Sequence, residues 1–532
     1  MAGFRQPELP RGQQVLWSQR LDETVPVDHP VRLFDQLLRS SALAGTFAAW
    51  ENEYVRCAGQ PPYHPRDLAG LYLYGLLNRL RSSRQLEAAC YNRLDVLWLL
   101  QRQTPDHATI AAFVRDHRPR LRQLFRDVVQ VGLRAELIRL EHTAHDGTKI
   151  EADAGRGSVH KDTTLAAELA VVDTQLAALE AEWAANEQRE GAWFGAETPW
   201  APPGQASARQ RLAALERKQA ALRQALAQIE RRQAEAGPRG CQPIGSTTDP
   251  DSRCMKDKEG RRKPNYNAQL TVDEAAGLIV AAEVSDQPQD VGQLTPALAQ
   301  AAANCGRRPQ AVTADSGYTS GPELAALEAS GQVVYLPDSD QSAPRSVPPE
   351  TQAARAAVAA GQPLTAAQWA GLPRDQNGRL MRAAFVYEAG RDVYRCPAGQ
   401  SLGVVTTHSS QRAWGRVVRT RYGFRTAPPC AACAWAGQCC ARPERGRRLD
   451  RDQYEGQRER MRARLESAAG QALYRRRKAT VEPRIGYLKQ ALGVRRFLHR
   501  GLAAVRAEWL LVCTAANIGV LLRHWTQVVP VL

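Results

Sequence analysis

The sequence lacks any uninterrupted apolar run that approaches the roughly 20 residues needed to cross a bilayer as a helix. Its polar start, MAGFRQPELPRGQQ, also lacks the apolar centre of a signal peptide. We therefore expect a cytoplasmic protein with no membrane partner. In that reducing compartment the 11 cysteines are expected as buried thiols or metal ligands, and not as disulfides.

Acidic residues are in the minority. The 532 residues include 71 Lys+Arg and 55 Asp+Glu, which gives a net charge of +16, while the hydrophobic fraction of 43% is enough for several buried cores. Between Arg442 and Arg500 there are 18 basic and 7 acidic residues, so this stretch alone supplies +11. Such a concentration favours a polyanionic partner, because neutralising phosphates releases counterions. The alternative is a solvated face of an arginine-rich chain.

Apolar residues three and four apart between Pro30 and about Leu137 predict an all-helical N-terminal domain over residues 1–137. Asp106 precedes His107-Ala108-Thr109 and is expected to start a helix. The polar faces hold basic side chains at Arg79, Arg81, Arg84, Arg118, Arg120 and Arg122. A basic helical face is compatible with docking into a DNA groove, although helical domains pack in this way for many other purposes.

A heptad pattern predicts a helical hairpin, inserted over residues 156–244. Its first helix carries Leu165, Leu169, Val172, Leu176, Leu179 and Trp183, and its second carries Leu212, Leu215, Leu222, Leu226 and Ile229. The segment between them, GAWFGAETPWAPPG, cannot continue a helix. The two apolar faces could pair with one another, pair with a second subunit, or form a solvated stalk.

Alternating segments predict a mixed α/β sheet over residues 138–155, 245–340 and 454–532. The strands are expected in RLEHTAHDGTKIEA, YNAQLTVD, GLIVAAEVS, PQAVTA and VVYLP, with helices in DVGQLTPALAQAAANC and PELAALEAS. In this arrangement Asp146 and Asp315 both lie near strand ends. The C-terminal segment AVRAEWLLVCTAANIGVLLRHW is apolar enough to pack against the sheet.

A second insertion, residues 341–453, holds the densest group of cysteines. Cys396, Cys430, Cys433 and Cys439 or Cys440 form a C…C-x2-C-x5-C arrangement among turn residues. Four thiolates suit a tetrahedral structural Zn²⁺ ion, which would hold together a loop-rich segment with too little core to fold alone. Buried thiols without a metal are the alternative.

Three distant carboxylates, Asp146, Asp315 and Glu482, are candidates for a metal site. If they converge, they can hold two Mg²⁺ or Mn²⁺ ions roughly 3.5–4 Å apart, an arrangement that supports cleavage of a phosphodiester bond. Each also has an ordinary explanation, since Asp-Gly and Asp-Ser-Gly are common turn pairs and Glu482 could be a surface residue.

The third carboxylate lies in the most basic segment. On a helix, Arg475, Lys478, Glu482 and Lys489 are at offsets of −7, −4, 0 and +7 and share a face. Pro483 disfavours the α conformation at Glu482, so a kink or a helix restart is expected there. The alternative is an exposed helix stabilised by local ion pairs.

Three blocks, HDGTKIEA, TADSGYTS and YRRRKATVEPRIGYLKQALGVRRFLHRG, resemble in this order the catalytic blocks of the DDE transposases of bacterial insertion sequences. The segment from GQPPYHPRDL to TIAAF resembles the helical domain that precedes the catalytic core in these enzymes. The resemblance implies a ribonuclease-H-like catalytic domain and an N-terminal domain that contacts the terminal inverted repeats of the element.

Carried over by position, the resemblance makes Asp146, Asp315 and Glu482 the catalytic metal ligands. The implied DNA-contacting residues are Tyr474, Arg475, Arg477, Lys478, Lys489, Arg495 and Arg496. The family pattern is Tyr-x2-Arg-x3-Glu-x6-Lys. The distance from Glu482 to Lys489 fits it, but Arg477 lies one residue too far from Glu482, so Lys478 is the alternative.

The resemblance also implies a reaction on double-stranded DNA. Water hydrolyses a phosphodiester at the end of the element, and the freed 3′ hydroxyl attacks the target DNA. A homodimer that holds two ends, associated with the nucleoid, is expected. A host-adapted DNA-binding protein without catalysis and a structure-specific nuclease are the competing hypotheses.

Overall fold

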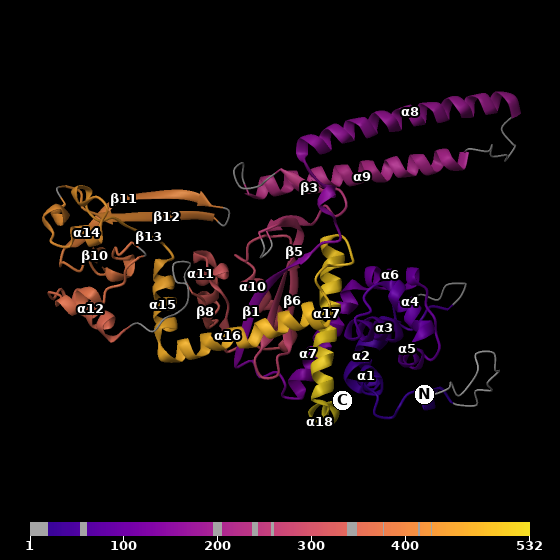
Figure 1. Cartoon of the computed structure of the whole chain (residues 1–532), viewed down its shortest axis with the longest axis horizontal. Helices are drawn as coiled ribbons and strands as arrows, with labels where there is room; N and C mark the ends of the chain where they lie inside the picture. Colours follow the sequence, from indigo (N-terminus) through magenta and orange to yellow (C-terminus); the bar gives the residue numbers. More distant parts are fainter. Residues whose placement is uncertain are drawn as a thin grey trace, which may run out of the picture. The chain divides into compact units, whose positions relative to one another are not determined.

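The computed structural model (Figure 1) describes residues 20–53, 61–194, 205–236, 243–256, 260–337, 348–375, 377–412, 415–426 and 428–532. The polar start of the chain and most of the predicted connector GAWFGAETPWAPPG lie outside these residues. The chain divides into two compact units. The helical unit comprises Met1–Glu136, Gln490–Gly493 and Ala507–Leu532, and the sheet unit comprises Leu137–Lys489 and Val494–Arg506.

The helical unit begins with a series of short helices. They are α1 (Pro30–Arg39), α2 (Ser41–Glu51), α3 (Pro65–Leu77), α4 (Ser83–Asn92), α5 (Leu94–Leu99), α6 (His107–Asp116) and α7 (Arg118–Arg134). The prediction for Asp106 is confirmed, because its Oδ1 accepts a hydrogen bond from the N–H of Thr109 at 2.7 Å and caps α6. In the core, the Trp50 ring stacks on Phe113 with centroids 5.1 Å apart.

The predicted basic face of this unit is only partly available to a partner. Arg79, Arg81 and Arg120 use their guanidinium groups for contacts within the unit. Arg84 and Arg122 are exposed. A helical sequence pattern cannot distinguish these cases, because it predicts the exposed side of a helix but not the neighbours that cover it.

The long C-terminal helix α17 (Leu502–Arg523) is followed by α18 (Trp525–Val528). By length and composition, α17 is the one helix among the described residues that could cross a membrane, but most of its residues are buried within the protein. Its apolar character on all sides is that of a core helix. The sequence assigned residues 454–532 together to the α/β domain, whereas Ala507–Leu532 belong to the helical unit.

A mixed six-stranded sheet organises the other unit, which confirms the α/β class. Its strands are β1 (His142–Glu151), β4 (Arg253–Lys256), β5 (Arg262–Asp273), β6 (Ile279–Ser285), β7 (Ala311–Thr313) and β8 (Val334–Tyr335). The order is β4-β5-β1-β7-β8, with β6 also paired to β5. The pairs of β5 with β1, β4 and β6 are antiparallel, and β1–β7 and β7–β8 are parallel. Helices α10 (Leu294–Cys305) and α11 (Gly321–Ala329) accompany the sheet.

Asp146 does not lie near a strand end. It is the fifth residue of the ten-residue strand β1 and pairs with Leu270 of β5, and Gly147 continues the ladder opposite Gln269. Asp146-Gly147 is therefore not a turn, because both residues remain in the pleated pairing. Asp315 follows β7 by two residues, as predicted, and its Oδ1 accepts the N–H of Gly317 at 2.9 Å in a short 3-10 turn.

The heptad segments form two long helices, α8 (Asp162–Phe194) and α9 (Gln205–Ala236). They pack against each other through a cluster that includes Leu165, Val172, Leu176, Leu222, Ala225 and Ile229. Of the three possibilities for the apolar faces, pairing within the chain is the one observed. A short ribbon of β2 (Val159–Lys161) and β3 (Ile244–Ser246) joins the two segments that flank these helices.

The basic segment folds into α15 (Glu455–Glu466) and α16 (Ala468–Gly486). Of the predicted kink or helix restart at Pro483, the restart does not occur, since α16 continues through this residue. The irregularity comes later, as a π-helical turn at Tyr487–Ala491. The N–H that proline lacks thus costs α16 one hydrogen bond without ending the helix.

The cysteine-rich segment forms its own five-stranded antiparallel sheet in the order β13-β12-β11-β10-β9. The strands are β9 (Val386–Glu388), β10 (Val393–Arg395), β11 (Ser401–Arg412), β12 (Gly415–Gly423) and β13 (Leu449–Asp452), with helices α12 (Pro349–Ala360), α13 (Ala366–Ala370) and α14 (Ala436–Cys439). A hydrophobic cluster around Trp369, Leu380, Tyr394 and Leu402 gives it a core. The expectation of a segment without much core was therefore wrong.

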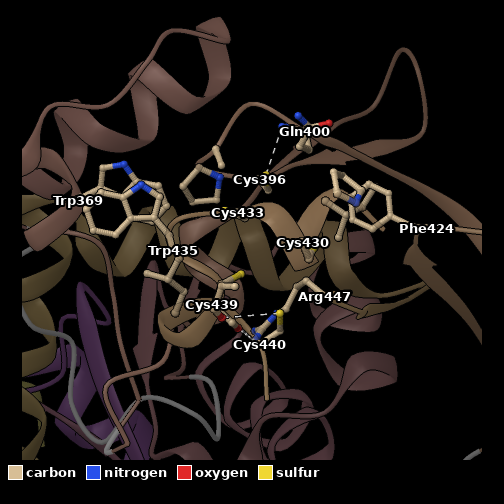
Figure 2. Close-up of a pocket in the computed structure, with 16 residues that line it drawn as sticks. Trp369, Cys396, Gln400, Phe424, Cys430, Cys433, Trp435, Cys439, Cys440 and Arg447 are labelled. Atoms are coloured by element: carbon tan, nitrogen blue, oxygen red, sulfur yellow. Dashed lines mark hydrogen bonds between the residues drawn. The ribbon is translucent and has the colours of Figure 1, made fainter. Parts of the chain in front are cut away.

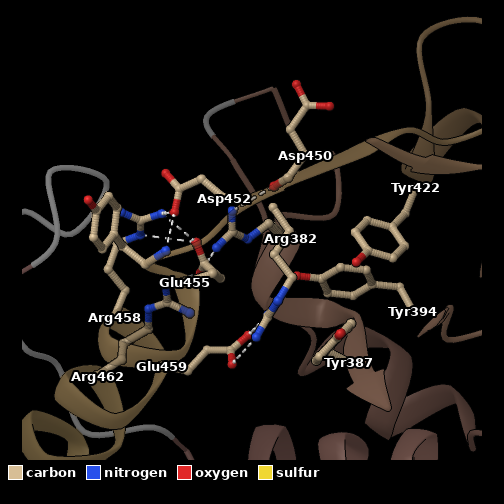
Figure 3. Close-up of polar contacts among 12 residues, drawn as sticks. Arg382, Tyr387, Tyr394, Tyr422, Asp450, Asp452, Glu455, Arg458, Glu459 and Arg462 are labelled. Carbon is tan, nitrogen blue, oxygen red and sulfur yellow. Dashed lines mark hydrogen bonds and ion pairs between the residues drawn. The ribbon is translucent and has the colours of Figure 1, made fainter. Parts of the chain in front are cut away.

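A buried ion-pair network connects this sheet to α15 (Figure 3). The carboxylate of Glu455 is fully buried and pairs with Arg458 at 2.9 Å, with Arg462 at 3.2 Å and with Arg382. One buried anion thus neutralises cations from two elements. Loss of this buried anion would remove three ion pairs at once, which costs more than an exposed ion pair contributes.

We expect Glu455→Gln to lower the free energy of unfolding by about 2–3 kcal/mol, because three guanidinium groups lose the buried anion that they share, while Arg458 keeps its second pair with Asp452. Thermal unfolding followed by circular dichroism measures the effect. Glu328→Gln is the matched control, because Glu328 forms an exposed pair with Arg460 at 2.7 Å. Equal stability of the two variants would contradict the role assigned to Glu455.

Candidate active site

The parallel pairing of β1 with β7 brings Asp146 and Asp315 level with each other. Ala144 of β1 pairs with Thr313 of β7. Asp146 comes two residues after Ala144, and Asp315 comes two residues after Thr313. The two carboxylates are close enough to interact electrostatically, although 169 residues separate them in the sequence. The register of the sheet therefore brings the first two predicted site residues together.

A third carboxylate, Asp290, joins this pair and was not predicted. It precedes α10, and its Oδ1 accepts hydrogen bonds from Asn267 Nδ2 at 2.8 Å and from Gln269 Nε2 at 2.9 Å, both on β5. It interacts electrostatically with both Asp146 and Asp315. The sequence shows Asp290 only as an acidic residue between β6 and α10. Its place beside Asp146 and Asp315 depends on the order of the strands, which the sequence does not give.

Gly147 makes the approach of Asp290 possible. A Cβ atom at this position would lie 2.9 Å from Asp290 Oδ1, 2.5 Å from Gln269 Nε2 and 3.0 Å from the Tyr318 hydroxyl. Any larger residue would displace at least one of these groups. The glycine next to Asp146 is thus explained by packing and not by a turn.

Burial and the neighbouring carboxylates raise the pKa of both Asp146 and Asp315. Burial raises the pKa of Asp146 from 3.8 to about 6, Arg477 opposes this rise, and Asp315 and Asp290 add to it. Burial also raises the pKa of Asp315, and Asp290 adds to that rise. A nearby cation would relieve the repulsion and favour the ionised forms.

Helix α16 supplies a buried arginine to the same place. Arg477 Nη1 lies 3.5 Å from Asp146 Oδ2, and only 9% of the arginine side chain is exposed. Its Nε and Nη1 atoms are buried without a hydrogen bond. The guanidinium also lies 5.8 Å from the centre of the Tyr474 ring, and burial raises the pKa of the Tyr474 hydroxyl. Asp146, Asp315, Tyr474 and Arg477 are therefore brought together.

Other predicted residues lie elsewhere on this segment. Arg475, Lys478 and Glu482 are exposed. Glu482 follows Arg477 by five residues, which corresponds to about 140° around an α-helix, so the two do not share a face. In the described part of the chain no contact joins Glu482 to Asp146 or Asp315. Arg477, and not the alternative Lys478, is the basic residue beside the aspartates.

Two of the last three predicted DNA-contacting residues, Lys489 and Arg496, contact the end of β1 or the residues that follow it. Lys489 Nζ donates to the carbonyl oxygen of Lys149 at 3.1 Å, and Arg496 pairs with Asp153 at 2.8 Å. Arg495 is exposed. Lys489 and Arg496 therefore contact residues that come three and seven positions after Asp146 in the chain.

The carboxylates fit a hard divalent cation in their chemistry. All three offer oxygen ligands, and burial and mutual repulsion disfavour three unbalanced negative charges. As they stand, no group of three or more His, Cys, Asp or Glu side chains among the described residues is arranged to hold a metal ion. The five cysteines of the predicted zinc site, Cys396, Cys430, Cys433, Cys439 and Cys440, line one pocket of the cysteine-rich sheet.

The raised pKa of Asp146 predicts a pH-dependent stability. The folded state holds the proton more tightly than the unfolded state, so the stabilisation is complete below about pH 4 and is lost as the pH rises through about 6. A rise of two pKa units corresponds to about 3 kcal/mol, so Asp146→Asn should stabilise the metal-free protein at pH 7.5 by about 1–3 kcal/mol.

The gain should be absent at pH 4, where the wild-type carboxyl group is also neutral. Denaturant unfolding of both proteins at the two pH values, in the presence of a chelator, measures it. A gain of the same size at both pH values would show that the charge of Asp146 is not its cause.

Comparison with protein families agrees with this geometry. A family model described as "Transposase domain (DUF772)" matches residues 19–116, and two described as "Transposase DDE domain" match residues 240–364 and 395–522. Asp290 and Asp315 lie in the second range, Arg477 and Glu482 lie in the third, and Asp146 lies in none. Searches of curated proteins and of solved structures found no match.

DDE transposases act on DNA and generally use divalent metal ions. The chain is therefore an insertion-sequence transposase of the DDE type, an enzyme of the polynucleotidyl transferase and endonuclease class.

Proposed function

We propose that this transposase cleaves phosphodiester bonds at the ends of its insertion sequence and joins the freed 3′ ends to target DNA. The observation that carries the proposal is the convergence of Asp146 and Asp315 across the β1–β7 pair, with a buried arginine beside them. We also propose that the sheet is ribonuclease-H-like. Three antiparallel strands, β6, β5 and β1, followed by the parallel strands β7 and β8, support this assignment.

Asp146 and Asp315 are the proposed ligands of two divalent ions, Mg²⁺ or Mn²⁺. Such ions activate the attacking oxygen and stabilise the leaving oxygen of an in-line displacement. Asp290 supplies a further carboxylate, held in place by Asn267 and Gln269. By the family resemblance, Glu482 is the remaining ligand, and its exposure leaves its carboxylate accessible.

Arg477 is the proposed contact for the scissile phosphate. Two of its buried nitrogen atoms have no hydrogen-bond acceptor, and a phosphate offers several. Lys489, Arg495 and Arg496 would bind the phosphates of the DNA backbone. Such contacts position the protein on the duplex but do not read the base sequence. The exposed Arg475 and Lys478, with Tyr474, complete the proposed DNA-contacting set on α16.

The helical unit is the proposed reader of the terminal inverted repeats, with exposed Arg84 and Arg122 among its DNA-contacting residues. A homodimer that holds two element ends, acting in the cytoplasm on the nucleoid, completes the proposal. Because α8 and α9 use their apolar faces within the chain, the dimer contact is expected elsewhere.

Strand cleavage of DNA that carries the native element ends, with Mg²⁺ or Mn²⁺, tests the catalytic assignment. Asp146→Asn and Asp315→Asn should reduce cleavage by more than about 100-fold, since loss of even an outer-sphere partner of a metal ligand costs 10–100-fold. DNA binding should remain, as an electrophoretic mobility shift reports. Glu328→Gln, an exposed acid on α11 paired with Arg460, is the control. Full cleavage by either aspartate variant would reject the site.

The contributions of Asp290 and Glu482 are separable. If both act at the ions, Asp290→Asn and Glu482→Gln should each lower cleavage by at least about 10-fold and weaken the thermal stabilisation of the protein by Mn²⁺. Wild-type cleavage and an unchanged response to Mn²⁺ in one variant would remove that residue from the site and leave the other.

Joined products of donor and target DNA separate the competing functions. A transposase produces them, whereas a structure-specific nuclease yields cut DNA alone, and a host-adapted binding protein yields neither. Primer extension across donor–target junctions detects the joined strands. Cleavage without junctions under conditions that support binding of both DNAs would favour the nuclease.

A further inference from the structure

Five cysteines surround one small, mostly apolar pocket in the cysteine-rich sheet (Figure 2). Cys396, Cys430, Cys433, Cys439 and Cys440 all line it, around a cavity of about 30 Å³. That volume exceeds what one water molecule needs, so a single ion fits. The cysteines come from three separate turns of the chain, and no disulfide joins them.

The first turn presents a sulfur atom that accepts a backbone hydrogen bond. The N–H of Gln400 donates to Cys396 Sγ at 3.2 Å, and the N–H of Gly399 donates to the carbonyl oxygen of Cys396 at 2.9 Å. Gly399 adopts a φ of 81°, in the left-handed region that glycine permits. Burial raises the pKa of the Cys396 thiol, and this backbone donor opposes that rise.

The second and third turns bring the other sulfur atoms to the same place. Cys430 and Cys433 occupy one tight turn, in which the N–H of Cys433 donates to the carbonyl oxygen of Cys430 at 3.2 Å. Cys439 ends α14. The thiol of Cys396 interacts electrostatically with those of Cys430 and Cys433, and that of Cys439 interacts with those of Cys396 and Cys430. Four thiols from three turns therefore form one mutually interacting set.

The surroundings of the pocket supply a positive charge and apolar walls. The Arg447 guanidinium donates to the carbonyl oxygen of Cys439 at 2.7 Å, while its Nε atom is buried without a hydrogen bond. Trp369 and Trp435 stack at one side with ring centroids 4.4 Å apart. A cation-bound group of four thiolates carries a net negative charge, which Arg447 would partly balance.

We propose that Cys396, Cys430, Cys433 and Cys439 bind one structural Zn²⁺ ion in this pocket. Zinc favours four thiolate ligands in tetrahedral geometry, and a site closed by four protein ligands stabilises a fold without taking part in chemistry. As they stand, no three of the His, Cys, Asp or Glu side chains in the described ranges are arranged to hold a metal ion, so the proposal requires that the sulfur atoms move closer together when the ion binds. The ion ties β10 and β11, through Cys396, to the turns that precede β13.

Cys440 is the rival of Cys439 as the fourth ligand, because its thiol also lines the pocket and interacts with those of Cys430 and Cys433. Its Sγ contacts the carbonyl oxygen of Ala436 at 3.8 Å, and its side chain is buried among protein atoms. We assign Cys439 because its thiol interacts with that of Cys396 in the first turn as well as with that of Cys430. Cys440 therefore provides a matched control one residue from a proposed ligand.

Zinc content of the purified full-length protein, measured by inductively coupled plasma mass spectrometry, tests the site. The wild-type protein and Cys440→Ser should each hold one equivalent of zinc after dialysis, while Cys433→Ser and Cys439→Ser should hold less than a tenth of that. X-ray absorption at the zinc edge should show four sulfur neighbours at about 2.3 Å. A wild-type protein without zinc, or with a shell of nitrogen and oxygen atoms, would overturn the proposal.

A variant that fails to fold would lose zinc for an unrelated reason, so wild-type protein provides the second measurement. Removal of zinc by a chelator should expose the Trp369–Trp435 stack to solvent and shift tryptophan fluorescence, with recovery when zinc is restored. DNA binding by the helical unit should persist in the zinc-free protein. Zinc removal without any spectral change would show that the bound metal is not in this pocket.

Discussion

Repulsion between carboxylates held at one partly buried place is the constraint on which the site depends. The parallel register of β1 and β7 sets Asp146 beside Asp315, and two amide side chains of β5 hold Asp290 against them. Burial, and after it the like charges of Asp315 and Asp290, raise the pKa of Asp146 to about 6. A fold retains such an arrangement when positive charge can enter it, from Arg477 or from a divalent ion.

Sequence periodicity predicted the elements that depend on local patterns. The cap at Asp106, the two long heptad helices and the strand that precedes Asp315 all follow from spacing along the chain. The pairing of the two helices with each other was one of three possibilities that the spacing left open. The position of Asp146 within β1 did not, because Asp-Gly is compatible with both a turn and a strand. What decides between them is the partner strand β5, which lies more than 100 residues later.

The site was predictable only in part for the same reason. Asp146 and Asp315 were found because each lies in a predicted strand or directly after one, in a block that resembles a catalytic block of the family. Asp290 has no such block, and Gly147 gains its meaning only from the side chains that meet it in space. On α16, residue spacing suggested that Lys478 and Glu482 share a face, but the neighbouring strand selects Arg477 as the buried residue. A helix pattern predicts which residues share a face but not which face is covered.

Arg477 connects the electrostatics of the site to its proposed chemistry. Its guanidinium lies 3.5 Å from Asp146, too far for a strong hydrogen bond, and two of its nitrogen atoms remain without acceptors. A buried donor without a partner costs free energy, as does a buried carboxylate without a cation. Because the ion pair between Arg477 and Asp146 satisfies each group only in part, a ligand that brings both phosphate oxygens and divalent cations would relieve the remaining cost at both. DNA with bound metal ions is such a ligand, so the unsatisfied groups and the proposed reaction have a common physical explanation.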